Sequence, residues 1–202
     1  MSAYPIVLDG AAIRAVVIGG GEVAARKVFA LLDAGAQVHV VAPRISAELD
    51  AASDHGSLSV TRGAYRAEQL GDATLVFAAT DDASINAQIA DDARRAGKLV
   101  NVVNAPANGD FVTPAVHRSG DVVVAVVAGG VPKAASRIRD LIAQSIDERY
   151  GQAVGALSVL RRDLLGRGDR AAWREASSDL LGASFYDDVA SGRIAAKVDR
   201  WR

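Results

Sequence analysis

A run of three glycines at positions 19–21 separates a short apolar segment from a helix-like segment near the start of this 202-residue chain. The apolar segment covers 13–18, and residues 23–34 place their apolar side chains on one helical face. A buried strand that passes through glycines directly into a helix is typical of a βα unit in a parallel sheet. The turn therefore constrains the fold more than any other feature of the sequence.

The rest of the first half repeats this alternation of strand and helix. Short helices are expected from Ser46 to about residue 53, and from the cap residues 80–82 to about residue 96. Further strands are predicted at 38–41, 58–61, 75–79 and 99–103. Because connections between parallel strands are right-handed, the pattern predicts an α/β, Rossmann-type parallel sheet with helices on both faces.

The pattern changes after Pro106. Strands are predicted at 111–114 and 121–127, a helix at 134–149, and a small helical tail over the last fifty or so residues. We expect a Rossmann domain at 1–112, a small β/α region at 113–150 and a helical C-terminal domain at 151–202. The β-branched run at 122–127 and the helix after it carry more apolar surface than so small a region can bury alone, which predicts a homodimer.

Composition excludes several kinds of site. The chain has no cysteine, so disulfides, thiolate zinc sites, iron–sulfur clusters and cysteine nucleophiles are excluded. Its three histidines are scattered, and no metal site is predicted. A net charge of −1 gives no indication of binding to nucleic acid or to an anionic membrane. No secretion signal or membrane-spanning run is present, and we expect a cytoplasmic protein.

The glycine turn fits the pattern G-x-G-x-x-A over residues 19–24. Gly19 permits the tight turn, Gly21 lets the backbone approach a pyrophosphate, and Ala24 allows the helix to pack closely on the strand. Glu22 and Val23 then lie in the first helical turn, whose free N–H groups attract phosphates. The pattern predicts a bound dinucleotide, and the alternative is a glycine turn that only packs a βα unit.

The loop after the second strand lacks the acidic residue that usually binds the adenosine ribose. Pro43 and Arg44 stand there instead. Arg44 has three interpretations: it pairs with a 2′-phosphate and favours NADP, it lies along the adenine ring, or it is a solvated surface residue. NAD is expected, and the sequence leaves NADP open. Thr80 and Asp81 follow the next strand and are predicted either to contact the cofactor or only to cap a helix.

Five segments, in this order, carry a family resemblance. They read GGGEVAARK at 19–27, VVAP at 40–43, AATDD at 78–82, NVVNAP at 101–106 and AGG at 128–130. The chain resembles the precorrin-2 dehydrogenase family, the NAD-dependent module of siroheme synthase, over about its first 140–150 residues. A multifunctional siroheme synthase would continue into a methyltransferase domain, so the resemblance predicts the stand-alone form.

The resemblance implies that NAD⁺ oxidises precorrin-2 to sirohydrochlorin in siroheme biosynthesis. Some members of the family also insert ferrous iron. It further implies a homodimer formed by the region after about residue 113. The substrate carries many carboxylates, and basic side chains suit carboxylates. Gly129, Gly130, Lys133 and Arg137 are the predicted substrate-side residues. Other basic candidates are Arg14, Arg26, Lys27, Arg118 and Arg139, each of which has a solvated surface charge as its alternative.

The sequence departs from the family where the chemistry is expected. The family motif usually reads N-V-V-D, and its aspartate position is occupied here by Asn104. An amide can orient a substrate but does not take a proton at neutral pH. Three interpretations remain open: positioning alone suffices, another group such as Asp110, Asp81 or His117 stands in, or the protein binds its ligand with little turnover. The last of these is a non-catalytic dinucleotide- or tetrapyrrole-binding module.

A second departure follows the Gly129–Gly130 turn. The family usually has T-S-P there, whereas residues 131–133 read VPK, and Ala128 stands where a serine is common. These changes remove hydroxyls from the substrate side and weaken the case for iron insertion more than the case for cofactor binding. His117 is a candidate base or metal ligand, and its alternative is a partly exposed turn residue.

Overall fold

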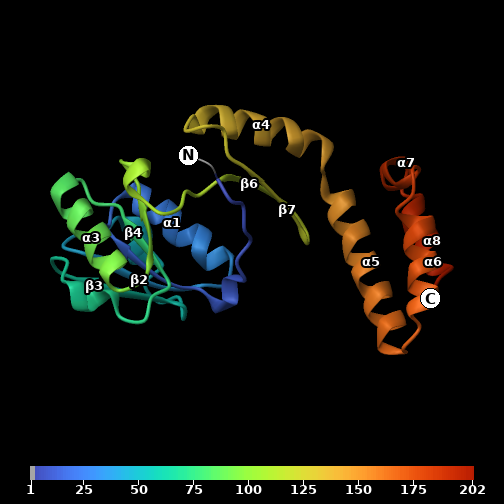
Figure 1. Cartoon of the computed structure of the whole chain (residues 1–202), viewed down its shortest axis with the longest axis horizontal. Helices are drawn as coiled ribbons and strands as arrows, with labels where there is room; N and C mark the ends of the chain where they lie inside the picture. The colour runs from blue at the N-terminus through green and yellow to red at the C-terminus, as the bar shows by residue number, and fades with distance from the viewer. Residues whose placement is uncertain (1–2) are drawn as a thin grey trace. The chain divides into compact units, whose positions relative to one another are not determined.

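The computed structural model describes residues 3–202 and divides the chain after Thr113 into two units (Figure 1). The first unit contains a five-stranded parallel sheet in the order β3-β2-β1-β4-β5. Its elements are η1 (Gly10–Ala12), β1 (Arg14–Ile18), α1 (Glu22–Asp33), β2 (Gln37–Ala42), α2 (Ala47–Ala51), β3 (Leu58–Arg62), η2 (Ala67–Leu70), β4 (Leu75–Ala78), α3 (Ala83–Arg95), β5 (Leu99–Val102) and η3 (Pro106–Asn108). This arrangement confirms the predicted Rossmann-type α/β fold.

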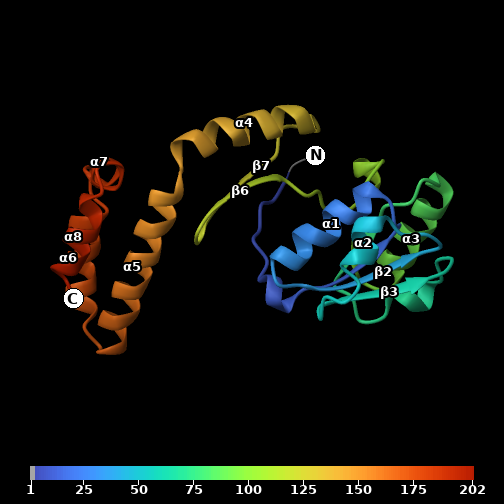
Figure 2. The ribbon, with the colours of Figure 1, turned by 180° about the vertical axis from the view of Figure 1, so that it is seen from behind.

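Burial on both faces explains why the central strands are almost continuously apolar. Val17 of β1 pairs with Val40 of β2 and with Phe77 of β4, and all three side chains are buried. Helices α1 and α2 cover the face that carries these residues, and α3 covers the opposite face (Figure 2). Because the strands are parallel and in register, their carboxyl ends lie at one edge of the sheet.

The connection from β3 to β4 contains the short turn η2 where a Rossmann fold usually has a full crossover helix. Tyr65 lies in this connection and donates a hydrogen bond to the buried Asp92 of α3 (3.0 Å). Burial and this hydrogen bond raise the pKa of the Tyr65 hydroxyl. The connection is thereby anchored to α3, but it covers less of the sheet than a helix would.

The second unit begins with an antiparallel hairpin of β6 (Ala115–Ser119) and β7 (Val122–Val126), followed by helices only. Helix α4 (Pro132–Ser145) packs on the hairpin. The remaining helices, α5 (Glu148–Gly166), α6 (Arg170–Leu180), α7 (Phe185–Ala190) and α8 (Arg193–Asp199), share an apolar core. Within it the buried Asp188 accepts hydrogen bonds from Lys197, Ser184 and Arg193, which together hold the pKa of its carboxyl at about 2.

Two predicted elements are wrong. The strand expected at 111–114 is absent, and β6 begins at Ala115 instead. Phe111 packs edge-on against Phe77, with ring centroids 5.4 Å apart, and its carbonyl accepts a hydrogen bond from Asn101 (2.8 Å). The segment is therefore part of the first unit's packing, because tertiary contacts outweigh its local preference for a strand.

The single helix expected at 134–149 is also wrong, because α4 and α5 are separated at residues 146 and 147. Ile146 adopts φ −110° and ψ 79°, and Asp147 is the N-cap of α5. The hairpin binds both carbonyls: His117 Nε2 lies 2.6 Å from that of Ile146, and the Ser119 hydroxyl donates to that of Asp147 (2.6 Å). These bonds replace the helical ones that the break removes.

The boundary expected between residues 150 and 151 lies inside α5, and the separate dimerisation region and tail domain stay a prediction. Across residues 3–202, none of the helices is long and apolar enough to cross a membrane.

Candidate functional site

The glycine turn after β1 lies against the loops that follow β2 and β4. The Gly19 N–H donates to the Val41 carbonyl (2.9 Å), and the φ of Gly19 is +130°. A Cβ on Gly19 would stand 2.2 Å from the Ala79 carbonyl oxygen. No side chain fits at that distance, so this position requires glycine both for its backbone angle and for its close approach to the neighbouring loop.

Gly20 is required for a reason that the sequence pattern missed. A Cβ there would stand 2.1 Å from the carbonyl oxygen of Arg44, and the Gly20 carbonyl accepts a hydrogen bond from the Ser46 N–H (2.7 Å). The middle glycine of the run therefore holds the loop after β2 against the turn. The pattern G-x-G-x-x-A allows any residue at position 20, and the presence of a third glycine there was the available signal in the sequence.

Gly21 is the N-cap of α1, and it lies in open space. A Cβ on Gly21 would meet nothing within 4 Å, and no side chain caps this end of the helix. The first helical hydrogen bond is donated by Ala25 to the Gly21 carbonyl (3.0 Å), which leaves the three preceding N–H groups without a helical acceptor. Those groups belong to Glu22, Val23 and Ala24. Free N–H groups at the positive end of a 12-residue helix fit a pyrophosphate.

The small side chain of Ala24 is fully buried beneath this helix. It belongs to the core cluster that joins α1 to strands β1 and β2, which agrees with its expected role in close packing. The packing of α1 on the sheet therefore fixes where the helix begins. The same packing fixes the direction in which the N–H groups of its first turn point.

Thr80 follows β4 and is held by a residue that the sequence analysis did not identify. Asn86 of α3 is buried, and its side-chain oxygen accepts from the Thr80 N–H (3.1 Å) while its amide donates to the Thr80 carbonyl (2.9 Å). The Thr80 hydroxyl also bonds to Asn86 (2.8 Å). An asparagine on the buried face of a helix, three residues before Ile89, was the available signal.

The two aspartates after Thr80 have different environments. Asp82 caps α3 and accepts hydrogen bonds from the hydroxyl and N–H of Ser84 and from the Ile85 N–H, which together lower the pKa of its carboxyl. Asp81 is exposed and makes no hydrogen bond or ion pair within residues 3–202. Asp82 is therefore the helix cap, and Asp81 is the carboxylate available to a ligand.

Asn104 lies just beyond β5, at the same edge of the sheet as the glycine turn. The preceding Val103 N–H donates to the Ala78 carbonyl (3.0 Å), which ties this loop to the end of β4. The Asn104 side chain is exposed and forms no hydrogen bond with any residue that the structure describes. The edge therefore brings together the glycine turn, the Pro43–Arg44 loop, Thr80 with Asp81, and Asn104.

Asp110 lies away from this edge. Its carboxylate accepts the N–H of Val100 (3.0 Å), two residues before the end of β5, and pairs with Arg94 (3.1 Å). Both carboxylate oxygens are thereby engaged, and this geometry favours a structural role over that of a proton acceptor. The same argument applies to His117, which lies in the second unit with its Nε2 at the Ile146 carbonyl.

The substrate-side residues expected after β7 lie at the start of α4. Gly129 and Gly130 have positive φ values of 51° and 82°, which favour glycine in this turn. Lys133 and Arg137 are exposed, one helical turn apart, and line an open groove of about 600 Å³ whose other lining residues are Val131, Ala134, Ser136 and Asp140. Arg139 instead pairs with Asp140 (2.7 Å) on the same helix.

The other basic candidates have diverse surroundings. Arg14 pairs with Asp72 at the amino end of β1, while Arg26 and Arg118 are exposed. Lys27 of α1 is partly buried and donates to the Thr113 hydroxyl. Burial and the neighbouring Arg26 charge lower the pKa of its ammonium group.

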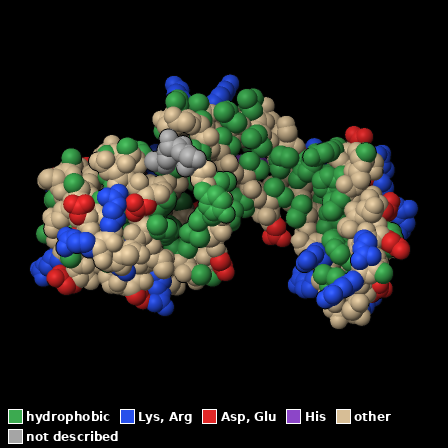
Figure 3. Space-filling model, in the orientation of Figure 1, with side chains coloured by type: hydrophobic (Ala, Val, Ile, Leu, Met, Phe, Trp, Pro, Cys, Tyr) green, Lys and Arg blue, Asp and Glu red, His purple; other side chains and the backbone are tan. Residues whose placement is uncertain are grey.

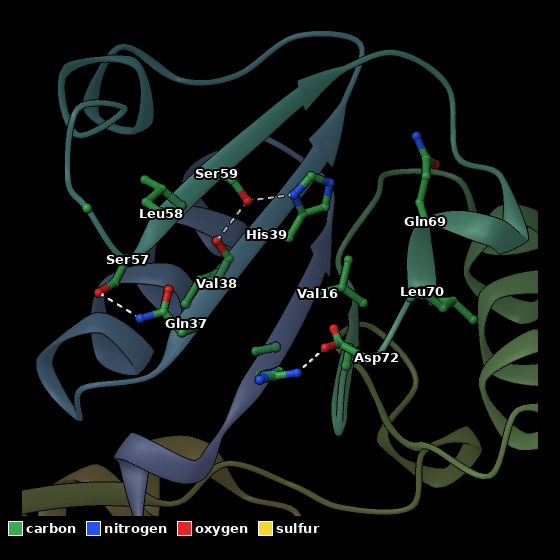
Figure 4. A pocket seen from close by; sticks show the side chains of 15 residues that line it. Val16, Gln37, Val38, His39, Ser57, Leu58, Ser59, Gln69, Leu70 and Asp72 are labelled. Carbon is green, nitrogen blue, oxygen red and sulfur yellow. Dashed lines mark hydrogen bonds and ion pairs between the residues drawn. The ribbon is translucent and has the colours of Figure 1, made fainter.

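A second cavity lies on the face of the sheet that the β3–β4 connection covers incompletely (Figure 4). It measures about 410 Å³ and is lined near the amino ends of β1 and β2. His39 Nδ1 lies 2.7 Å from the Ser59 hydroxyl there, and burial lowers the pKa of the imidazole. This cavity is separate from the glycine turn, which follows the other ends of the same strands. Within residues 3–202, no cluster of three or more histidine or carboxylate side chains could hold a metal ion.

A family model described as "Putative NAD(P)-binding" matches residues 6–115, a range that contains the glycine turn and all of the sheet. The chain belongs to this NAD(P)-binding family. The matched range ends just after the first unit. Membership in this family and the free N–H groups of α1 both indicate that the turn binds a nicotinamide dinucleotide.

Curated relatives named siroheme synthase match most of this chain. The protein from Nitrosospira multiformis is 37% identical over 203 residues, which cover 98% of this chain and 41% of that protein. The protein from Pseudomonas entomophila is 40% identical over 185 residues, which cover 91% of this chain and 38% of that protein. The chain thus spans about two fifths of the length of these relatives.

A solved structure, that of SirC, precorrin-2 dehydrogenase, has the same fold. The two chains superpose with a TM-score of 0.79 at 25% sequence identity, and the match covers 98% of this chain and 100% of that chain. The likeness therefore includes both units and is not limited to the NAD(P)-binding sheet.

We predict that Gly21→Asp weakens NAD⁺ binding by roughly a hundredfold or more, because a carboxylate would project where the pyrophosphate binds and would repel it. The fold should remain, since a side chain at this position meets nothing within 4 Å. Titration calorimetry measures the affinity, and thermal unfolding verifies the fold. Gly56→Asp is the matched control, because that glycine is equally open but lies at the opposite edge of the sheet. Unchanged NAD⁺ affinity in a folded Gly21→Asp variant would refute this location of the site.

Proposed function

We propose that this chain oxidises precorrin-2 to sirohydrochlorin with NAD⁺, a step in siroheme biosynthesis. The observation that carries the proposal is the match to SirC, precorrin-2 dehydrogenase, over 98% of this chain and 100% of that one. The names of the curated relatives agree with it. A Rossmann domain alone would not support a substrate, because the same fold serves many reactions.

The reaction removes two hydrogens from precorrin-2, one as hydride and one as a proton. The bound NAD⁺ supplies the acceptor for the hydride. The free N–H groups of Glu22, Val23 and Ala24 would hold the pyrophosphate, and the loops after β4 and β5 would border the nicotinamide half of the dinucleotide. The task of these loops is to hold the reacting carbon close to the nicotinamide, which alone can lower a barrier considerably.

The amide at position 104 limits the routes by which the proton can leave the substrate. The Asn104 side chain can donate a hydrogen bond to a substrate oxygen and accept one through its own oxygen, but it cannot take up a proton at neutral pH. The proton therefore passes to water or to a stand-in. Asp81 is the best placed of the proposed stand-ins, since it is exposed at the same edge of the sheet and carries no competing ion pair within residues 3–202.

Lys133 and Arg137 are the proposed partners of the substrate carboxylates. They project from successive turns of α4 into one open groove, and neither is engaged in an ion pair within residues 3–202. Two such cations one turn apart suit a polycarboxylate better than an isolated lysine does, because each carboxylate gains a charge-assisted hydrogen bond. Gly129 and Gly130 set the start of this helix.

A second candidate function is a non-catalytic module that binds the dinucleotide or the tetrapyrrole. Asn104 favours it, because the chain lacks a carboxylate at the family's aspartate position. The glycine turn and the two cations on α4 would bind the dinucleotide and the substrate carboxylates equally well in a dehydrogenase and in a binding module. Ferrous iron insertion stays a prediction of the family resemblance, and a cytoplasmic location stays a prediction from the sequence alone.

We predict slow turnover when the purified protein is incubated anaerobically with precorrin-2 and NAD⁺, seen as NADH formation together with the sirohydrochlorin spectrum. Asn104→Asp should raise kcat by up to about 10²–10⁴-fold, since it restores a group that can accept the proton. A rising limb near the carboxylate pKa should appear in the pH profile of the variant, and the native protein should show one only where Asp81 takes the proton. Asn108→Asp, which adds the same charge on the nearby η3, is the control and should leave the rate unchanged.

A fall in rate in Asn104→Asp would show that hydride positioning limits the reaction and that the new charge repels the substrate. Binding of both ligands without turnover by either form would reject the dehydrogenase and favour the binding module.

We propose that the chain forms a homodimer through the second unit. Several apolar side chains in or next to the hairpin and α4 are exposed, among them Val127 at 54% and Leu141 at 55%. The others are Val123, Val131 and Ile138. Figure 3 shows hydrophobic side chains, in green, gathered over this part of the second unit. A contiguous apolar surface of this kind marks an interface in a folded protein.

Light scattering at micromolar concentration should therefore give twice the mass of the 20.9 kDa chain. Leu141→Glu should shift the mass towards the monomer, because it buries an unpaired charge in the interface. The variant Leu181→Glu, at an equally exposed leucine after α6, is the control and should remain dimeric. A monomeric mass for the native protein would contradict the proposal.

A further inference from the structure

Residues 4–8 form an apolar arm that precedes η1. They read Tyr-Pro-Ile-Val-Leu, and all five are exposed, with Tyr4 and Val7 at 88%. They belong to no helix or strand, and their backbone groups form no hydrogen bond within residues 3–202. Because tyrosine, isoleucine and valine favour strands, the arm has the sequence of a strand but no sheet to join.

The arm begins at a point that is fixed on the first unit. Asp9 caps η1 by accepting the Ala11 N–H (3.1 Å). A Cβ on Gly10 would stand 1.7 Å from the carbonyl oxygen of Ala34, the residue that ends α1, so backbone meets backbone there. Five extended residues span about 17 Å beyond this point, which is the length of an ordinary strand.

The hairpin of the second unit has an open edge along β7. β6 and β7 form a sheet of two strands, and Ser119 pairs with Val122 across a two-residue turn (Figure 1). A turn of this length closes on a hydrogen-bonded pair and the pairs then alternate, so the N–H and C=O groups of Val123 and Ala125 point away from β6. No backbone hydrogen bond from outside the hairpin reaches these groups in the described part of the chain.

The two outer edges of the hairpin differ. On β6 the Val116 carbonyl accepts a hydrogen bond from Arg139 of α4 (3.5 Å). On β7 the face beside the open edge is apolar, with Val123 42% exposed, Val127 54% exposed and the exposed Ala125 between them. An uncovered apolar edge of this kind is a template for pairing with another strand. The edge of β7 therefore lacks what the arm provides.

We propose that the arm of one copy of this chain adds as a third strand to the β7 edge of a second copy. The proposal rests on the homodimer proposed above, because Val123 and Val127 belong to the same apolar surface. The two-fold symmetry of a dimer makes the exchange reciprocal, so that both arms and both edges are covered. Main-chain hydrogen bonds and apolar side chains then stabilise the interface together, as they do wherever a strand is added to a sheet edge.

Pro5 determines which residues of the arm bond to β7. Proline has no N–H to donate, and an edge strand tolerates it where that position faces solvent. Successive residues of a strand turn their N–H groups to opposite sides, so Val7 faces solvent together with Pro5. Tyr4, Ile6 and Leu8 then face β7. The arm is thus expected to alternate between bonded and solvated amides.

Amide exchange followed by NMR on the purified full chain tests this alternation. The Ile6 and Leu8 amides should exchange at least about tenfold more slowly than the Val7 amide when the protein is dimeric, because opening of the interface must precede their exchange. Equal exchange rates at the three positions would overturn the proposal.

Two proline variants form a matched pair for the dimer affinity, measured by light scattering over a dilution series. Ile6→Pro removes a bonded N–H and an apolar side chain, so it should raise the dissociation constant of the dimer about tenfold or more. Val7→Pro, the control, removes an N–H that faces solvent and should change this constant by less than about threefold. A dimer that Ile6→Pro leaves as stable as the native one contradicts the proposal.

Cross-linking shows whose hairpin the arm occupies, since the chain has no cysteine of its own. Ile6→Cys/Ala125→Cys protein treated with a short bismaleimide should give a linked product with twice the mass of the chain on a denaturing gel. Ile6→Cys/Tyr186→Cys, with its second thiol on α7, is the control and should not. A linked product with the mass of one chain would place the arm on its own hairpin and overturn the exchange.

A monomeric native protein would overturn both the exchange and the homodimer on which it rests. None of these results depends on NAD⁺ or precorrin-2. Titration with NAD⁺ and the turnover assay therefore test the proposed dehydrogenase separately, and it stands if the arm exchange alone fails.

Discussion

The close approach of the glycine turn to its two neighbouring loops is the constraint on which the rest of the site depends. Gly19 faces the Ala79 carbonyl and Gly20 faces the Arg44 carbonyl at distances that exclude any Cβ. Because backbone meets backbone at both points, α1 begins at a position set by the sheet and not by its own sequence. The orientation of its free N–H groups, and therefore of a bound pyrophosphate, follows from that packing.

The other loops at this edge of the sheet are also held in place by hydrogen bonds to their backbones. Thr80 is locked by the buried Asn86, and the loop carrying Asn104 is tied to the end of β4 by the Val103 N–H. Polar groups held by the backbone in this way need little reorganisation when a ligand binds. Residues whose side chains are already engaged, such as Asp110 and His117, maintain the fold at other places.

The sequence predicted the parts of the fold that depend on local pattern. The glycine turn and the apolar strands identified the parallel sheet, because buried parallel strands are continuously apolar and glycine is needed where backbones meet. The strand at 111–114 and the unbroken helix at 134–149 failed, since the packing of Phe111 on Phe77 and the hairpin's bonds to Ile146 and Asp147 join residues distant in sequence. Gly20 and Asn86 were missed for the same reason, as their partners become visible only in three dimensions.

Hydrogen–deuterium exchange with and without NAD⁺ tests the central claim most directly. The N–H groups of residues 22–24 have no helical acceptor in the free protein and should exchange quickly. NAD⁺ should slow exchange there and in the loops at 43–46, 79–81 and 103–105, which share the carboxyl edge of the sheet. The segments beside the other cavity, 55–57 and 69–72, should not change. Slowed exchange confined to that cavity, with none at the glycine turn, would contradict the account.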